Sequence, residues 1–288
     1  MRYLALSAML FLFAFGAVSQ ETAQVLPSDG TTVAMLCADV NRHVSGGGRI
    51  RANVVSNDSP DFAFVIPVAG NIAGANGTFF HSDLSIANRR SVAQIISVAF
   101  LRRNTNSGSD TLTTMSLPAN SVTDIDDFVG TRLGKTDLGA ILVVGQTAAG
   151  GIDSSALLDG FSRIWTPQPG STGTVSQSLS SIPVNDVIAD SFALGLKQDS
   201  RFRTNVGVVN TSGNTRNFTI TVRGSSGTTT MTASTPPYSM NQVSIPAGNW
   251  GNLSLLVGTA ASDFDWWSAY GTTVDNVTGD GWVSHAHH

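Results

Sequence analysis

An internal repeat constrains the fold of this chain more than any other feature of its sequence. Five blocks occur twice in the same order, with spacings that drift as loops of unequal length would make them drift. The pairs are Ile66–Val68 with Ile182–Val184, Ser82–Asn88 with Thr204–Asn210, Leu117–Ser121 with Thr235–Ser239, Leu142–Gly145 with Leu255–Gly258, and Ser162–Trp165 with Trp267–Tyr270. Each copy spans about 100–115 residues, which is an ordinary domain size. We interpret the chain as two tandem modules that arose by duplication of one gene segment.

The residue pattern inside each copy is that of β-strands. Phe218–Arg223 alternates apolar and polar residues, which places its apolar side chains on one face and its threonines on the other. Ile95–Leu101 predicts the corresponding strand of the first copy. Ala140–Val144 and Leu253–Val257 are short apolar runs, as is typical of buried strands. Short strands separated by Gly, Pro and Asn turns predict an all-β chain of two tandem immunoglobulin-like β-sandwich modules.

The N-terminus has the features of a secretory signal peptide. Arg2 precedes the apolar run Leu4–Val18, and small residues precede a cut after Ser19. A membrane anchor would need about 20 apolar residues, more than this run contains, and no other stretch of the sequence is long and apolar enough. We therefore expect a secreted or periplasmic mature chain without a membrane span, able to associate with the cell surface.

The predicted organisation has five parts. They are a signal peptide (1–19), a partly ordered lead-in (20–60), a first sandwich module (61–180), a second sandwich module (181–284) and a His-rich tail (285–288). In the lead-in, Thr32–Cys37 is expected to add an edge strand. Helix is expected only as short pieces near Asp124–Val129 and Val187–Phe192.

Charge and cysteine usage narrow the range of partners. Only 12% of the residues are charged, the net charge is −4, and no basic stripe is present, so a nucleic-acid partner is not expected. Cys37 is the single cysteine, which excludes an intramolecular disulfide. We expect Cys37 to be a small buried apolar side chain.

Two segments in particular resemble a known family. Asn76–Leu84, with Asn88 closing the strand, resembles a motif of secreted bacterial proteins that carry tandem immunoglobulin-like modules. Asp199–Asn210 resembles its second-module version, and Asp275–Asp280 resembles the family's closing turn. The likeness covers roughly residues 61–282. It implies the tandem architecture and no particular activity, since that family has no established biochemical function.

The residues needed for catalysis are scarce. The sequence has no metalloprotease, serine hydrolase or phosphate-binding motif. Three of the five histidines, His285, His287 and His288, lie at the C-terminus, which leaves His43 and His81. We therefore expect a protein that is not an enzyme, with a hydrolase that uses His81 as a remote alternative, because catalytic triads are defined by geometry and not by sequence order.

Aromatic residues of the second copy are the candidate ligand-binding group: Trp250, Trp266, Trp267 and Tyr270. Adjacent residues on a strand point to opposite faces, so one of Trp266 and Trp267 should lie in the core and the other on the outer face or at an interface. Exposed aromatic rings bind sugars or proteins, whereas buried ones fill cores.

Two acidic turns are candidate metal sites. Asp124, Asp126 and Asp127 form one, and Asp275 with Asp280 forms the other. Clustered carboxylates could hold calcium, and the alternative is a solvated turn or helix cap. No other cofactor is expected.

Taken together, these features favour an exported, non-enzymatic structural or protein-interaction protein at the cell surface or outside the cell. The alternative is a carbohydrate-binding protein that uses the second-module aromatics, assisted by calcium. The sequence does not identify the protein or glycan partner.

Overall fold

The computed structural model describes residues 23–27, 29–46, 62–74, 77–168, 170–184, 190–259 and 265–285. The predicted signal peptide, much of the predicted lead-in, His287 and His288 lie outside these ranges. The described part is mostly β, in antiparallel sheets, as predicted.

The first module is a sandwich of two sheets. Its strands are β1 (Gln24–Leu26), β2 (Ala63–Gly70), β3 (Ile72–Ala73), β4 (Phe79–Asn88), β5 (Gln94–Arg102), β6 (Thr113–Leu117), β7 (Ser121–Ile125), β8 (Leu138–Gln146), β9 (Leu158–Pro167), β10 (Thr174–Ser180) and β11 (Ile182–Pro183). One sheet has the order β1-β6-β5-β8-β2-β11 and the other the order β10-β9-β4-β3, with β7 also paired to β4. Apolar side chains from both sheets form the core between them, closed by the short helix α2 (Phe128–Thr131).

The second module is a sandwich of two four-stranded sheets. Its strands are β12 (Asp190–Gln198), β13 (Phe202–Asn210), β14 (Arg216–Gly224), β15 (Gly227–Thr235), β16 (Ser239–Ser244), β17 (Gly251–Thr259), β18 (Trp267–Asp275) and β19 (Gly281–His285). The sheet orders are β12-β17-β14-β15 and β16-β13-β18-β19. Phe218, Ile220 and Val222 all point into the core between these sheets, which confirms the predicted alternation of β14.

The two modules share one strand order. The order β2-β8-β5-β6 is repeated as β12-β17-β14-β15, and β7-β4-β9-β10 is repeated as β16-β13-β18-β19. Even an irregularity is shared, because β2 shifts register between Ile66 and Ala69 and β12 shifts between Ala193 and Leu196. Each module therefore reproduces the same topology, down to a bulge in its first core strand.

The strand pairing corrects part of the sequence alignment between the copies. Ser82–Asn88 and Thr204–Asn210 lie at equivalent positions, as predicted, and so do Leu117–Ser121 and Thr235–Ser239. The sequence alignment places Leu142–Gly145 and Ser162–Trp165 on the right strands of the second module, β17 and β18. The alignment is wrong by one residue for the first block and by four residues for the second. Ile182–Val184 has no counterpart in β2, because β11 pairs with β2 instead. Short apolar runs look alike in any strand, so their register had to come from the pairing.

The strand order is not that of an antibody domain. In an immunoglobulin constant domain the strands A, B, E and D share one sheet. Here the first two core strands of the first module, β2 and β4, lie in opposite sheets, as do β12 and β13 of the second. Both modules are thus β-sandwiches with a strand order of their own.

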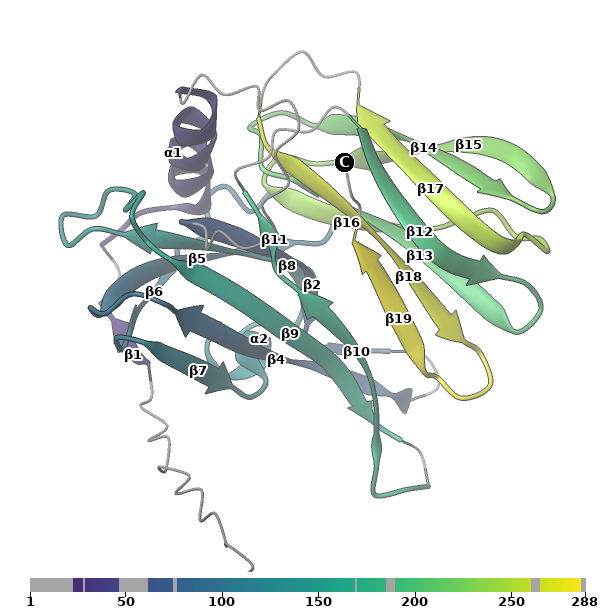
Figure 1. Ribbon diagram of the computed structural model, residues 1–288, viewed down its shortest axis with the longest axis horizontal. Helices are drawn as coiled ribbons and strands as arrows, with labels where there is room; N and C mark the ends of the chain where they lie inside the picture. The colour runs from purple at the N-terminus through teal and green to yellow at the C-terminus, as the bar shows by residue number, and fades with distance from the viewer. Residues whose placement is uncertain are drawn as a thin grey trace, which may run out of the picture.

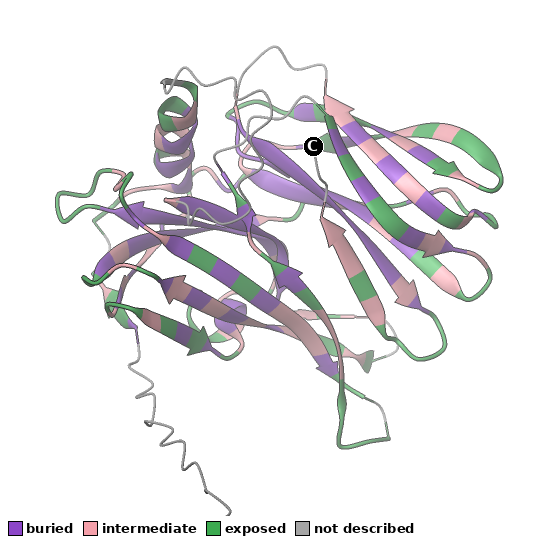
Figure 2. Cartoon of the chain, in the orientation of Figure 1, coloured by how far each residue is buried: buried purple, intermediate pink, exposed green. Residues whose placement is uncertain are grey.

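The two modules lie side by side (Figure 1), and a shared apolar core joins them. The outer face of β2, β5 and β8 packs against Val209, Met240, Trp266 and Tyr270 of the second module. In Figure 2 the strands between the modules are largely purple, and β2 is buried along its whole length. The backbone also crosses the junction, since the amide of Asn104 donates to the carbonyl of Met240 at 2.8 Å. The described parts of the two modules therefore form a single packed body.

A helix completes this shared core. The prediction of an edge strand at Thr32–Cys37 is wrong, because α1 (Val33–Gly46) is helical there. Its buried side chains, Val33, Leu36, Cys37 and Val40, follow the spacing of one helix face. An edge strand does exist nearby, at β1. Burial raises the pKa of the Cys37 thiol, as expected for the predicted buried apolar side chain.

The two short helices expected from the sequence have different outcomes. α2 lies close to the segment predicted near Asp124–Val129. For the segment near Val187–Phe192, residues 187–189 lie outside the described ranges, and Asp190–Phe192 are part of β12 and not helical. Neither α1 nor α2, the helices of the described part, has the length and apolar character that crossing a bilayer requires.

Candidate functional site

The outer face of the sheet β7-β4-β9-β10 carries the most varied exposed chemistry of the first module. Along β4 and β9, alternate side chains point into the core, and those between them point outward. Pairing of the two strands places His81 opposite Trp165, Asp83 opposite Arg163, and Ser85 opposite Phe161. The sheet therefore presents three aromatic side chains interleaved with charged ones.

An aromatic cluster occupies one end of this face. The His81 and Trp165 rings stack with centroids 4.8 Å apart, and Phe79 lies against His81 at 5.1 Å. The Arg163 guanidinium lies over the Trp165 ring, 5.8 Å from its centroid, at a distance typical of a cation–π contact. Nδ1 of His81 lies 3.2 Å from Oδ2 of Asp127. The rings hold one another in place and so form a firm platform.

His81 lacks the neighbours of a hydrolytic site. Its contacts are a carboxylate and two aromatic rings, and no hydroxyl of the described residues is hydrogen-bonded to it. A nucleophile within hydrogen-bond reach of the base is what a triad requires. The arrangement therefore supplies no support for the hydrolase alternative.

A groove of about 370 Å³ lies beside the aromatic cluster on the same face. Ser85 Oγ donates to Asp124 Oδ1 at 2.5 Å, and Arg163 lies 3.8 Å from Asp83. The side chain of Phe161 is 43% exposed. The lining residues are Asp83, Leu84, Ser85, Asp124, Ile125, Asp126, Phe161 and Arg163. With three carboxylates and one guanidinium, the groove has a formal charge of −2 (−3 plus +1).

The aromatic residues predicted to bind a ligand are all buried, so that prediction is wrong. Trp250, Trp266, Trp267 and Tyr270 are 8%, 1%, 2% and 0% exposed. Trp267 packs in the core of the second module and Trp266 in the shared core, which confirms that the adjacent pair points to a core and to an interface. Since none of the four presents a ring face at the surface, they form no platform for a sugar.

Polar atoms of two of these aromatics are satisfied internally. The Trp250 indole donates to the carbonyl of Pro246 at 2.9 Å, and the Tyr270 hydroxyl lies 3.0 Å from Gln242 Oε1. Burial raises the pKa of the Tyr270 hydroxyl. These aromatics serve packing, as large core side chains usually do.

The predicted acidic turns do not assemble a metal site. Asp124 accepts from Ser85, and Asp127 directly precedes α2 as its N-cap residue and faces His81. Asp126 lies in the turn between β7 and α2 and lines the groove. Within the described ranges, no three His, Cys, Asp or Glu side chains meet as metal ligands would.

The second acidic turn is held by an arginine. Arg201 donates to Asp275 Oδ2 through Nε at 2.8 Å and through Nη2 at 2.6 Å, and these bonds lower the pKa of Asp275 to about 2. Asp280 accepts from the backbone amide of Gly281 at 2.9 Å. This geometry matches the alternative of ordinary turn chemistry.

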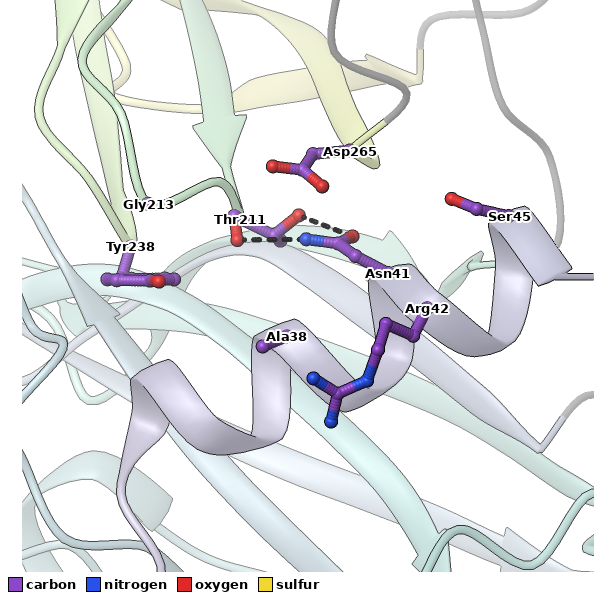
Figure 3. A pocket seen from close by; sticks show the side chains of 8 residues that line it. All are labelled: Ala38, Asn41, Arg42, Ser45, Thr211, Gly213, Tyr238 and Asp265. Carbon is purple, nitrogen blue, oxygen red and sulfur yellow. Dashed lines mark hydrogen bonds between the residues drawn. The ribbon is translucent and has the colours of Figure 1, made fainter.

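A second hollow, of about 260 Å³, lies where α1 meets the second module (Figure 3). Asn41 donates to the carbonyl of Thr211 at 3.2 Å and accepts from the amide of Trp266 at 3.0 Å. The Thr211 hydroxyl lies 3.3 Å from Asn41 Oδ1. Asn41 therefore fastens α1 to the second module, and we assign this hollow a structural role.

The sequence analysis missed Val122, Phe161 and Arg163 as surface residues of interest. A usable signal was present, because Phe161, Arg163 and Trp165 alternate along one strand and must share a face. Which of the two faces is exposed could not be read from that strand alone.

The described part of the chain is thus a pair of β-sandwich modules, the first of which exposes a sheet face with aromatic and acidic side chains. No protein-family model matches the chain, and no curated protein or solved structure matches it.

Proposed function

We propose that this chain is an exported, non-enzymatic structural or protein-interaction protein that acts at the cell surface or outside the cell. We propose further that the outer face of β7-β4-β9-β10 is its interaction surface. The resemblance to secreted bacterial proteins with tandem immunoglobulin-like modules belongs to the same proposal. The strand order common to both modules supports a tandem duplication.

One observation carries the proposal. Phe161 and Val122 are 43% and 58% exposed on the same face as the stacked His81 and Trp165. Interface hot spots are enriched in aromatic residues and arginine. Because the modules share a core, this face stands on a rigid support and would lose little freedom on binding.

Site-specific photocrosslinking in the cells that make the protein tests the proposal. A photoreactive phenylalanine analogue at position 161 should yield a defined crosslinked protein in the exported fraction. Thr230, exposed on β15 at the other free face of the molecule, is the matched control position and should yield none. Equal crosslinking at both positions, or none at 161, would overturn the assignment of the face.

Export is tested separately. N-terminal sequencing of the protein outside the cytoplasm should begin at Gln20, directly after the predicted cut. Recovery of the intact chain from the cytoplasm alone would contradict it.

A further inference from the structure

The free face of the first module has a buried counterpart in the second. β4, β7 and β9 are equivalent to β13, β16 and β18. Phe161 lies opposite Ser85, and in the same way Tyr270 lies opposite Gly207. The same correspondence pairs two further apolar positions: Ala87 with Val209, and Val122 with Met240.

In the second module these positions form a docking surface. Val209, Met240 and Tyr270 are all 0% exposed, because they pack against the outer face of the first module's sheet. In the first module, Phe161 and Val122 occupy the positions equivalent to Tyr270 and Met240, and both are exposed. Exposed apolar residues grouped on one face commonly mark interaction sites.

The two faces differ in charge. Four positions that are neutral on the equivalent face of the second module carry aspartate on the free face of the first. The pairs are Asn205 with Asp83, Gln242 with Asp124, Ser244 with Asp126, and Ser268 with Asp159. One basic side chain, Arg163, lies among the aspartates, at 3.8 Å from Asp83. A partner that covers this face must therefore supply positive charge around an apolar centre.

A second copy of the chain does not fit that description. Two copies of the free face would bring aspartates against aspartates. The other candidate is the outer face of β12-β17-β14-β15, which corresponds to the docking face of the first module. Three of its positions have become polar or charged, since Ala99, Leu101 and Ala140 correspond to Thr221, Arg223 and Ser254. Two others stay apolar, since Val65 and Leu142 correspond to Phe192 and Leu256. Among the positions compared only Arg223 is cationic, so that face does not supply the several cations that four aspartates require.

We propose that the face centred on Phe161 and Val122 docks a different protein, through a surface whose apolar residues are flanked by lysine or arginine. Phe161 and Val122 take the roles that Tyr270 and Met240 have inside the chain, and the four aspartates pair with the partner's cations. The inference rests on the proposed function and adds the chemistry of the partner.

Binding of a model peptide tests the inference. The probe is a synthetic strand of alternating lysine and valine, and the control probe replaces each lysine by glutamate. Titration calorimetry with the purified chain should show binding of the lysine peptide that weakens as salt rises, and no binding of the glutamate peptide.

Three variants assign the binding to the face. The quadruple variant D83N/D124Q/D126S/D159S gives the first module the residues that the second module accepts at the same positions. It and Phe161→Ser should each bind the lysine peptide at least about tenfold more weakly. Asp190→Asn, a matched change of an exposed aspartate on β12, should leave binding unchanged.

Equal binding of the two peptides, or unchanged binding by the quadruple variant, would overturn the inference. If Phe161→Ser does not fold, the quadruple variant by itself still tests whether the aspartates of this face bind the lysine peptide. A crosslinked partner at position 161 without lysine-peptide binding would defeat this inference and leave the proposed function standing. Lysine-peptide binding without any crosslinked partner would support the chemistry inferred for the face and contradict the proposed function.

Discussion

Asn88 and Asn210 occupy the same position in the two modules and make the same hydrogen bonds. Both are buried at the end of a strand. Asn88 Nδ2 donates to the carbonyl of Pro118 at 2.7 Å, and Asn210 Nδ2 donates to the carbonyl of Pro236 at 2.9 Å. Each side-chain oxygen also accepts the backbone amide two residues further along the chain. In each module, one side-chain amide thus joins a strand to a distant turn. Asn88 joins β4 to the turn that follows β6, and Asn210 joins β13 to the turn that follows β15.

The first prediction concerns these amides. Asn210→Asp keeps the acceptor oxygen but removes the donor, and it places a carboxylate against carbonyl oxygens. We expect a loss of at least about 3 kcal/mol in the free energy of unfolding, with a similar loss for Asn88→Asp. Urea denaturation measures it. Asn217→Asp, at an exposed position on β14, should change stability by less than about 0.5 kcal/mol. Comparable losses for all three variants would contradict the assigned role.

The second prediction concerns a close approach inside the shared core. A Cβ at Gly207 would lie 2.0 Å from the Tyr270 ring, so only glycine lets that ring cross the strand. Gly207→Ser should destabilise the chain by about 1–3 kcal/mol, because the ring must move out of a packed junction. Ser85→Gly, the reciprocal change at the equivalent, half-buried position of the free face, is the control and should cost less than about 1 kcal/mol. If Gly207→Ser leaves the thermal unfolding midpoint unchanged, the junction tolerates displacement of Tyr270 and the prediction is wrong.

The third prediction concerns coupling of the modules. Met240 is fully buried between them, whereas Met35 on α1 is 55% exposed. Met240→Lys places an unpaired charge in the shared core and should part the modules while leaving the two sandwich cores intact. Calorimetry should then resolve two unfolding transitions in place of one. Met35→Lys should keep a single transition. Two transitions already present in the unaltered protein would refute the coupling.

The fourth prediction concerns pH. The pKa of Asp275, about 2 in the folded chain, lies below the ordinary aspartate value of about 3.9 because Arg201 donates to its carboxylate. Ionised Asp275 therefore stabilises the fold above about pH 4, and this contribution is lost as the pH falls from about 4 through about 2. Asp275→Asn should lower the thermal midpoint at pH 7, and its difference from the unaltered chain should shrink by pH 2. If the difference in thermal midpoint between Asp275→Asn and the unaltered chain is the same at pH 7 and pH 2, the ion pair is not its cause.

Part of the candidate site could be anticipated from the sequence. The alternation along β9 is enough to place Phe161, Arg163 and Trp165 on one face. Their exposure could not be anticipated, because the equivalent face of the second module has the same alternation and is buried. The prediction failed at Tyr270 for the same reason, since a local pattern does not tell a free face from one that another module covers. Trp250 is buried instead in the core of the second module itself.

The lead-in shows a different limit. The apolar residues of α1 have helical spacing, yet Thr32–Cys37 also contains a run suited to a strand. The structure resolves this ambiguity, because the segment is helical, lies against β5 and completes the shared core with its one apolar face.

By itself, the sequence indicated the two copies, their β character and the placement of Trp266 and Trp267 on opposite faces. The copies follow from the repeated blocks, and the other two features follow from the local periodicity of each strand. Only the tertiary structure decided the strand order, the register between the copies and which sheet face is covered. Those depend on pairings between residues far apart in the chain, and a shift of one residue in pairing exchanges the two faces of a strand. The free face of the first module and the buried face of the second thus occupy equivalent positions in the two sandwiches, and the tertiary structure alone covers one and leaves the other exposed.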